Sequence, residues 1–201
     1  MNQFKQTSCV ILSAGYSLRM GMPKALLEFD TNQTFIEKIT DIYASAGIDE
    51  VVVVLQPNLF ELIFSKHILF AEKVTFVENL HPELGRFYSL SEGLKTINPH
   101  NSCFFQNIDN PFTSMEILYS LIQVKDEAEV IIPAYGSKKG HPVLINQRIV
   151  SNIVECSSNE MPINSFLQQF NMKHLSVNNP NVLSNVNSED DYAKWFQKKG
   201  Q

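Results

Sequence analysis

Short apolar runs that alternate with amphipathic stretches constrain the fold of this chain more than any other feature. Runs of strand length, rich in β-branched residues, occupy residues 8–14, 50–55, 73–77, 103–108, 128–133 and 142–145. Between the first five runs, apolar residues recur three or four positions apart at residues 34–46, 58–65, 88–96 and 114–124. This alternation is typical of a mostly parallel, doubly wound sheet, so we expect a three-layer α/β/α fold.

The order of the expected elements becomes less regular after Gly136. We expect a hairpin-like strand at residues 141–145, helices near 147–154 and 163–170, and a strand at 173–177. A closing helix is expected over residues 188–198, with Ser188 as its N-cap. The chain has 201 residues and no evident repeat or linker, so a single domain spanning residues 1–201 is expected.

Composition argues against several classes of protein, among them membrane-spanning, nucleic-acid-binding and disulfide-rich proteins. Hydrophobic residues make up 44% of the chain and charged residues 18%, and no apolar run is long enough for a membrane span. The formal net charge of −5 has the wrong sign for binding a polyanion, so we expect neither nucleic acid nor a membrane as a partner. Cys9, Cys103 and Cys156 are odd in number and far apart, which indicates neither a disulfide framework nor a zinc site. A cytoplasmic location is expected.

The loop at residues 12–24, directly after the first expected strand, is the most informative segment. Its small residues, with Gly15 and Gly21, let backbone N–H groups approach an anion closely. Arg19 adds a planar cation and Lys24 a point charge, so the loop can cradle a triphosphate. The same residues also suit a plain turn with solvated charges, and the pattern alone leaves both interpretations open.

Two other glycine motifs do not fit this loop. A P-loop ends in Gly-Lys-Ser/Thr, whereas Met22 and Pro23 separate Gly21 from Lys24. A nucleophile elbow needs a second glycine at the position that Arg19 occupies.

Four later positions are candidates for the same site. Asn79, Gly85 at the end of a loop, and Ser89 in the first turn of the helix that follows can meet a base or a phosphate, although an ordinary capped helix explains them as well. Asp109 follows the strand at 103–108 and therefore lies at a carboxyl end, where a carboxylate is well placed for Mg²⁺. A simple turn before the next helix is the alternative for Asp109.

The loop at 12–24 resembles the Leu-Ala-Ala-Gly-x-Ser-x-Arg-Met-Gly-x-Pro-Lys motif of the molybdopterin nucleotidyltransferases, and departs from it only at Ser13. The resemblance is strongest to the molybdenum cofactor cytidylyltransferases, and it implies a Rossmann-like, GT-A-like fold with a mostly parallel mixed sheet. Residues 85–94 are similar to the Gly-Met-x-x-Ser-Leu-x-x-Gly-Leu segment of that group, with Arg86 in place of Met. Residues 109–111 resemble its metal-binding Asp-x-Pro, and residues 140–145 its Gly-His-Pro-Val-Leu-Phe.

The resemblance implies a set of site residues. Catalytic roles fall to Arg19, Lys24 and Asp109, and Mg²⁺ binding to Asp109 with Asn185. The nucleotide-binding residues implied are Leu12, Ser13, Ala14, Gly15, Ser17, Arg19, Gly21, Lys24, Asn79, Gly85 and Ser89. His141 is interpreted as a half-buried histidine at a strand start rather than as a catalytic base, because phosphoryl-type transfer depends mainly on positioning.

The chain also departs from the cytidylyltransferase pattern at two places. The closing motif Asp-x-Asp-Thr-Pro-Glu-Asp carries Asn185 and Asn187 in place of its leading acids, as in the related guanylyltransferases. An asparagine carbonyl oxygen can still bind a hard cation, with one negative charge fewer. Residues 156–162 lack the Gly-Asp-x-Gly-x-Arg segment of that branch, so the identity of the acceptor stays open.

These observations predict a Mg²⁺-dependent nucleotidyltransferase. An acceptor phosphate, such as that of molybdopterin, attacks the α-phosphorus of a nucleoside triphosphate and pyrophosphate leaves. CTP is preferred over GTP because Ala14-Gly15 and residues 140–142 are closer to the cytidylyl branch. The alternatives are a sugar-phosphate or alcohol-phosphate nucleotidyltransferase, a glycosyltransferase on the same scaffold, and a nucleotide-binding protein without catalysis. The oligomeric state stays open.

Overall fold

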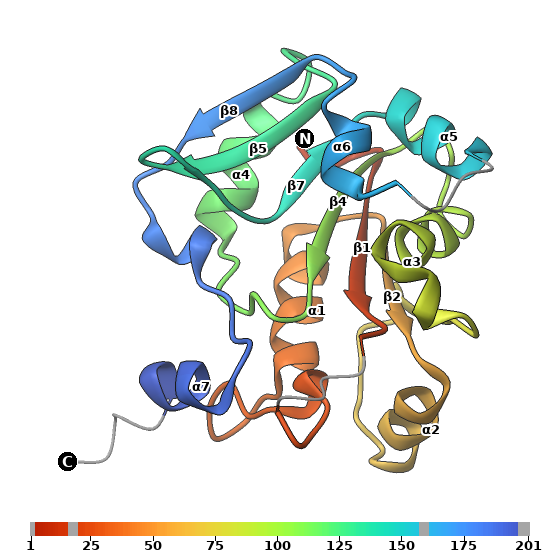
Figure 1. Ribbon diagram of the computed structural model, residues 1–201, viewed down its shortest axis with the longest axis vertical. Helices are drawn as coiled ribbons and strands as arrows, with labels where there is room; N and C mark the ends of the chain where they lie inside the picture. The colour runs from red at the N-terminus through yellow and green to blue at the C-terminus, as the bar shows by residue number, and fades with distance from the viewer. Residues whose placement is uncertain (1–2, 16–19, 157–160, 197–201) are drawn as a thin grey trace.

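The structure is a computed structural model that describes residues 3–15, 20–156 and 161–196 (Figure 1). Ser17, Arg19 and the end of the expected closing helix therefore lie outside the described residues. In the described part, eight strands form one sheet in the order β3-β2-β1-β4-β7-β5-β6, and β8 also pairs with β5. The strands are β1 (Thr7–Ser13), β2 (Glu50–Leu55), β3 (Val74–Glu78), β4 (Ser102–Asn107), β5 (Val130–Tyr135), β6 (Lys138–Lys139), β7 (Val143–Ile145) and β8 (Met172–Ser176).

The sheet is mixed, with its parallel strands on one side. β3, β2, β1 and β4 run parallel, β7 is antiparallel to both β4 and β5, and β8 is parallel to β5. The expected hairpin-like strand is thus confirmed as β7. The parallel half follows from the long helical crossovers between its strands, which a parallel connection needs.

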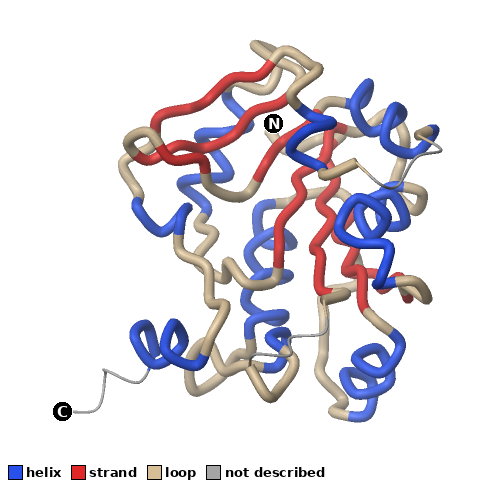
Figure 2. Tube along the Cα trace, viewed as in Figure 1, coloured by secondary structure: helices blue, strands red, loops and turns tan. Residues whose placement is uncertain are grey.

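Helices cover both faces of the sheet, as Figure 2 shows. Apolar side chains of α1 (Phe35–Ala46), α2 (Pro57–Ser65) and α4 (Met115–Gln123) pack on one face, and those of α3 (Gly85–Leu94), α5 (Gln147–Glu155) and α6 (Ile163–Leu167) on the other. α7 (Glu189–Phe196) closes the described chain. The three-layer α/β/α prediction is confirmed, and no described helix is both long and apolar enough to cross a bilayer.

Every residue of β1 is buried, and its side chains alternate between the two layers. Cys9 and Ile11 belong to the core under α1 and α4, whereas Val10 and Leu12 belong to the core under α3 and α5. Gly93 lets α3 approach this strand closely, because a Cβ there would lie 2.6 Å from Cγ1 of Val10. The last turn of α3 is thereby packed directly on the middle of β1.

The structure corrects two of the expected elements and adds one strand. The helix expected over residues 88–96 begins at Gly85, so Ser89 lies in its second turn rather than in the first. Gly85 has a φ of +86°, a conformation that glycine adopts readily, and it joins the short turn Pro82–Leu84 directly to α3. α6 ends at Leu167 instead of continuing to residue 170, and the two-residue strand β6 was not predicted because both of its residues are exposed lysines.

Candidate active site

The loop after β1 and the loop after β4 begin side by side. Leu12 is paired with Asn107 in the parallel register, and the N–H of Ile108 donates to the carbonyl oxygen of Leu12 at 3.0 Å. Both strands end at this edge, so the residues that follow them face the same space. Ligands of open α/β sheets bind at such carboxyl ends.

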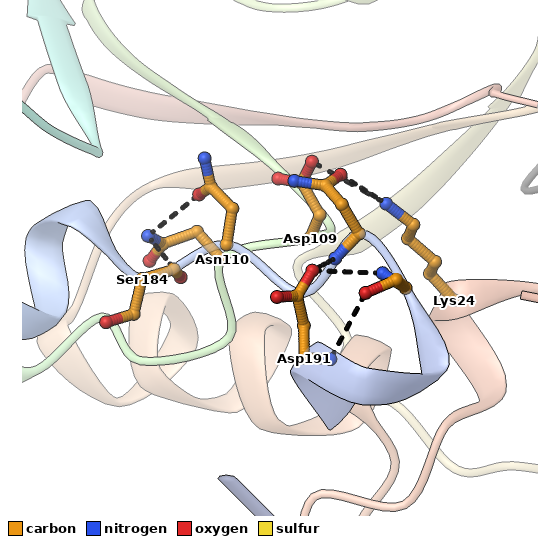
Figure 3. Close-up of polar contacts among 8 residues, drawn as sticks. Lys24, Asp109, Asn110, Ser184 and Asp191 are labelled. Carbon is orange, nitrogen blue, oxygen red and sulfur yellow. Dashed lines mark hydrogen bonds and ion pairs between the residues drawn. The ribbon is translucent and has the colours of Figure 1, made fainter. Parts of the chain in front are cut away.

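Lys24 is brought to this edge by the short 3-10 turn Lys24–Leu26, which is anchored by the buried side chains of Ala25 and Leu26. Its Nζ lies 3.8 Å from Oδ2 of Asp109 and donates to Oδ1 of Asn187 at 2.7 Å (Figure 3). The Lys24 and Asp109 side chains are only 12% and 13% exposed, so water screens this pair less than it would a surface ion pair. The structure therefore brings together two of the three residues expected to be catalytic.

One of the two carboxylate oxygens of Asp109 is available to a ligand. Its backbone carbonyl accepts from the N–H of Val186 at 2.7 Å, and its Oδ2 faces Lys24. Its Oδ1 is buried and has no hydrogen-bond partner among the described residues. A buried carboxylate oxygen in that state suits a divalent cation, and Mg²⁺ typically binds one or two carboxylates with phosphate oxygens and waters. The residues present thus fit a divalent metal ion.

The segment before α7 holds Asn187 in place. The carboxylate of Asp191 accepts from the backbone N–H of Asn187 at 2.9 Å and from that of Ser188 at 3.1 Å. The Ser188 hydroxyl in turn accepts from the N–H of Asp191 at 3.2 Å, which confirms Ser188 as the N-cap. Hydrogen bonds from the Asn187 N–H and from Ser188 lower the pKa of the Asp191 carboxyl below its ordinary value. Asn187 is therefore fixed by α7 against Lys24.

Aromatic packing brings α7 to this position. Phe196 lies against Phe29 and Phe35, with ring centroids 5.6 and 5.4 Å apart, and the Tyr192 hydroxyl donates to the carbonyl oxygen of Glu28 at 2.9 Å. Figure 1 shows α7 beside the loop that precedes α1. The contact between Asn187 and Lys24 thus depends on a helix far along the chain. Asn187 and Asp191 were not among the site residues predicted from the sequence, although the Ser-x-x-Asp spacing of a capped helix was a usable signal.

Asn185, the expected second metal ligand, is exposed and lies against the residue after Asp109. The Asn110 side-chain amide donates to the carbonyl oxygen of Ser184 at 2.9 Å and to Oδ1 of Asn185 at 3.3 Å. This amide ties the segment before α7 to the loop that carries Asp109, as Figure 3 shows for Asn110 and Ser184. Asn185 keeps its metal role only as a proposal.

The remaining nucleotide-binding candidates fall into two groups. In the loop after β1, Leu12, Ser13 and Ala14 are buried, the Ser13 hydroxyl has no hydrogen-bond partner among the described residues, and a Cβ at Gly15 would meet open space. Gly21 has a φ of +63°. The second group shapes the entry to α3: Asn79 donates to Oγ of Ser89 at 3.0 Å, and that hydroxyl donates to the carbonyl oxygen of Gly85 at 3.0 Å.

His141 is a partly buried histidine near the candidate active site, and two groups of opposite charge act on its pKa. It is half-buried just before β7, which confirms the interpretation from the sequence. Burial lowers the pKa of its imidazole below the ordinary 6.5, the nearby Asp109 carboxylate raises it, and Arg86 lowers it. The imidazole is therefore neutral near pH 7. Within the described ranges, the buried Nδ1 of His141 has no hydrogen-bond partner.

Comparisons with known proteins identify the family. The family model of the MobA-like NTP transferase domain matches residues 9–175. A probable molybdenum cofactor guanylyltransferase of Bacillus cytotoxicus is 24% identical, over 97% of this chain and 98% of that protein.

Solved structures show the same fold. Rv0371c from Mycobacterium tuberculosis superposes with a TM-score of 0.80 at 22% identity, over 96% of this chain and 99% of that one. A further structure of Rv0371c is a complex with manganese, with a TM-score of 0.76 at 21% identity over 96% and 100% of the two chains. The molybdopterin-guanine dinucleotide biosynthesis protein A of Archaeoglobus fulgidus gives a TM-score of 0.71 at 18% identity over 94% and 97%. The expected GT-A-like fold is confirmed.

Proposed function

This chain belongs to the MobA-like NTP transferase family, a family of nucleotidyltransferases, and we propose that it transfers a guanylyl group from GTP to a phosphorylated acceptor, with molybdopterin as the first acceptor to test. This proposal rests on one observation: Nζ of Lys24 lies 3.8 Å from Oδ2 of Asp109 at the carboxyl edge of the sheet. Lys24 lies at the end of the loop that follows β1. A cation and a carboxylate at that edge suit the two charges of a metal–nucleotide complex.

The proposed reaction is an in-line displacement. An oxygen of the acceptor phosphate forms a bond to the α-phosphorus of the nucleotide, and the bond from that phosphorus to the pyrophosphate oxygen breaks. Lys24, with the N–H groups of the loop after β1, stabilises the charge that builds on the departing pyrophosphate. Arg19 would add a second cation from the same loop. The reaction requires no covalent intermediate on the protein.

The divalent ion is proposed to be Mg²⁺, held by Asp109 and, in this proposal, by Asn185. When bound it neutralises charge on the phosphate oxygens during the displacement. Asn187 and Asp191 position Lys24 and do not themselves contact the reacting atoms. The buried Oδ1 of Asp109 is the atom offered to the ion, because Oδ2 already faces Lys24.

Guanine is proposed as the base for two reasons. The curated relative named above is called a guanylyltransferase, and Asn185 and Asn187 match the guanylyl branch in the closing motif. CTP, preferred on the sequence alone, is the second candidate because residues 140–142 resemble the cytidylyl branch. A sugar phosphate or an alcohol phosphate is the alternative acceptor, and nucleotide binding without turnover is the alternative to catalysis.

A pyrophosphate-release screen tests the proposal. The four ribonucleoside triphosphates are each combined with molybdopterin and with a panel of sugar and alcohol phosphates, in Mg²⁺, Mn²⁺ or excess chelator. We expect release with GTP and molybdopterin that needs the divalent ion. Release with CTP alone would show that the base is cytosine rather than guanine. Release with another acceptor would show that the acceptor is not molybdopterin. Calorimetric binding of nucleotide with no turnover in any combination would establish the non-catalytic alternative.

A further inference from the structure

A cavity of about 410 Å³ opens on the α3 and α6 face of the sheet, next to the candidate active site. Residues of α3, the last residue of β4, His141 and the segment 161–164 line it. Asn107 connects the cavity to the active site, because it lies in the cavity wall, pairs with Leu12 in register, and precedes Asp109 by two positions. A molecule bound here can therefore reach the place where the nucleotide phosphates are proposed to lie.

The walls of this cavity combine apolar and polar groups. Phe87 and Phe105 are buried core residues that present aromatic surface to it, and Ile163 extends the apolar wall. The amides of Asn107 and Asn164 and the imidazole of His141 are polar groups of the same wall. An apolar cavity with a few polar groups suits a flat, heterocyclic ligand, because the ring body packs on the aromatic side chains and its edge atoms meet the amides.

Arg86 is the permanent cation among the described residues that line the cavity. It is exposed, and within the described part of the chain no carboxylate forms an ion pair with it. The sequence carries this arginine where the resembled motif has methionine. A guanidinium at a cavity mouth with no carboxylate partner is suited to the oxygens of a phosphate, which it can bind through two parallel hydrogen bonds.

We infer that Arg86 determines acceptor specificity: it binds the phosphate of a flat, partly apolar acceptor whose ring body lies against Phe87 and Phe105 in this cavity. The inference rests on the proposed function, since it assigns the acceptor of that reaction. In the proposed function, Lys24 and the loop after β1 bind the nucleotide phosphates. Arg86 is therefore available to bind a second anionic group. His141 lines the same cavity as Arg86.

Binding of two fluorescent probes tests this inference without needing turnover. The probes are 6-hydroxymethylpterin phosphate and the same pterin without its phosphate. Wild-type protein should bind the phosphate form more tightly, and Arg86→Met should weaken that form by about tenfold to a hundredfold while leaving the other form unchanged. Arg148→Met is the matched control, because Arg148 is an exposed arginine on α5 that pairs with Glu129 and does not line the cavity. GTP binding should be the same in all three proteins.

Three results would overturn the inference. The first is that wild-type protein does not bind the pterin phosphate. The second is that Arg86→Met binds each probe as tightly as wild-type protein does. The third is that Arg86→Met binds GTP more weakly while its binding of both probes is unchanged. The last result would assign the cavity to the nucleotide. The pyrophosphate screen separates this inference from the proposed function, because Arg86-dependent probe binding without pyrophosphate release would refute the function alone.

Discussion

Nζ of Lys24 lies 3.8 Å from Oδ2 of Asp109, although one residue follows the first strand and the other follows the fourth. Parallel strands with long crossovers produce this meeting, since their carboxyl ends share one edge. Asn187 completes the arrangement from α7 by accepting a hydrogen bond from Lys24. The active-site proposal thus depends on three segments that only the tertiary fold brings together.

The first prediction concerns the cap of α7. Asp191→Asn removes charge from the carboxylate that accepts from the N–H groups of Asn187 and Ser188, so Asn187 should no longer be held firmly against Lys24. We expect the turnover rate to fall by about tenfold, as for other groups that orient a ligand-binding residue. Steady-state pyrophosphate release measures it. Asp190→Asn, an exposed neighbour on the same helix, should keep the wild-type rate. Equal rates in the two variants would count against the positioning role.

A second prediction addresses Asn185 as a metal ligand. Asn185→Ala should raise the Mg²⁺ concentration needed for half-maximal activity by about tenfold, with little change in the rate at saturating Mg²⁺. The measurement is a Mg²⁺ titration of pyrophosphate release. Asn32→Ala, at an exposed turn position, is the control. An unchanged midpoint in Asn185→Ala would remove Asn185 from the metal site and leave Asp109 as its protein ligand.

Close packing of α3 on β1 leads to a third prediction. Gly93→Ala places a methyl group 2.6 Å from Cγ1 of Val10 and 2.8 Å from Cγ2 of Val54, so the helix must shift. We expect a loss of about 1–3 kcal/mol in the free energy of unfolding, despite the better helix propensity of alanine. Denaturant unfolding measures it. Glu92→Ala, one position earlier on α3, should cost less than about 0.5 kcal/mol. A neutral Gly93→Ala would mean that α3 is not held by this contact.

A fourth prediction follows from the lowered pKa of His141. The unfolded chain binds a proton near the ordinary pKa of 6.5 more readily than the folded protein does, because burial, aided by Arg86 and opposed by Asp109, disfavours the imidazolium. This contribution to stability is intact above about pH 6.5 and is lost as the pH falls through the folded-state pKa. His141→Asn should therefore lose less stability than wild type on acidification. Unfolding free energies across that range measure the difference, and His100→Asn, an exposed histidine, should follow the wild-type curve.

The sequence predicted the parallel half of the fold and the edge where the site lies, and the reason is local. Alternating runs near residues 8–14 and 103–108 place strand ends before Gly15 and Asp109 without any tertiary information. Helix periodicity failed at the start of α3, because its first two residues, Gly85 and Arg86, are not apolar and Gly85 has a positive φ. That shift by one turn is why Ser89 lies deeper in the helix than expected.

The partners of Lys24 could be predicted only in part. Asp109 was expected near it because both follow strands of one sheet. Asn187 was not, because its contact requires α7 to dock through Tyr192 and Phe196, and that packing has no local signal in the sequence. The cavity at Arg86 was also beyond sequence reasoning, since segments from both halves of the chain line it.

The central claim is that Lys24 and Asp109 act together on a metal-bound nucleoside triphosphate, and pyrophosphate release by Lys24→Ala and Asp109→Ala tests it most directly. We expect each variant to lose at least about a hundredfold in rate while keeping the wild-type circular dichroism and melting curve, because each removes one preorganised charge at the reacting phosphates. The exposed controls Lys66→Ala and Asp126→Ala should keep the wild-type rate. Wild-type rates in both Lys24→Ala and Asp109→Ala would contradict the account.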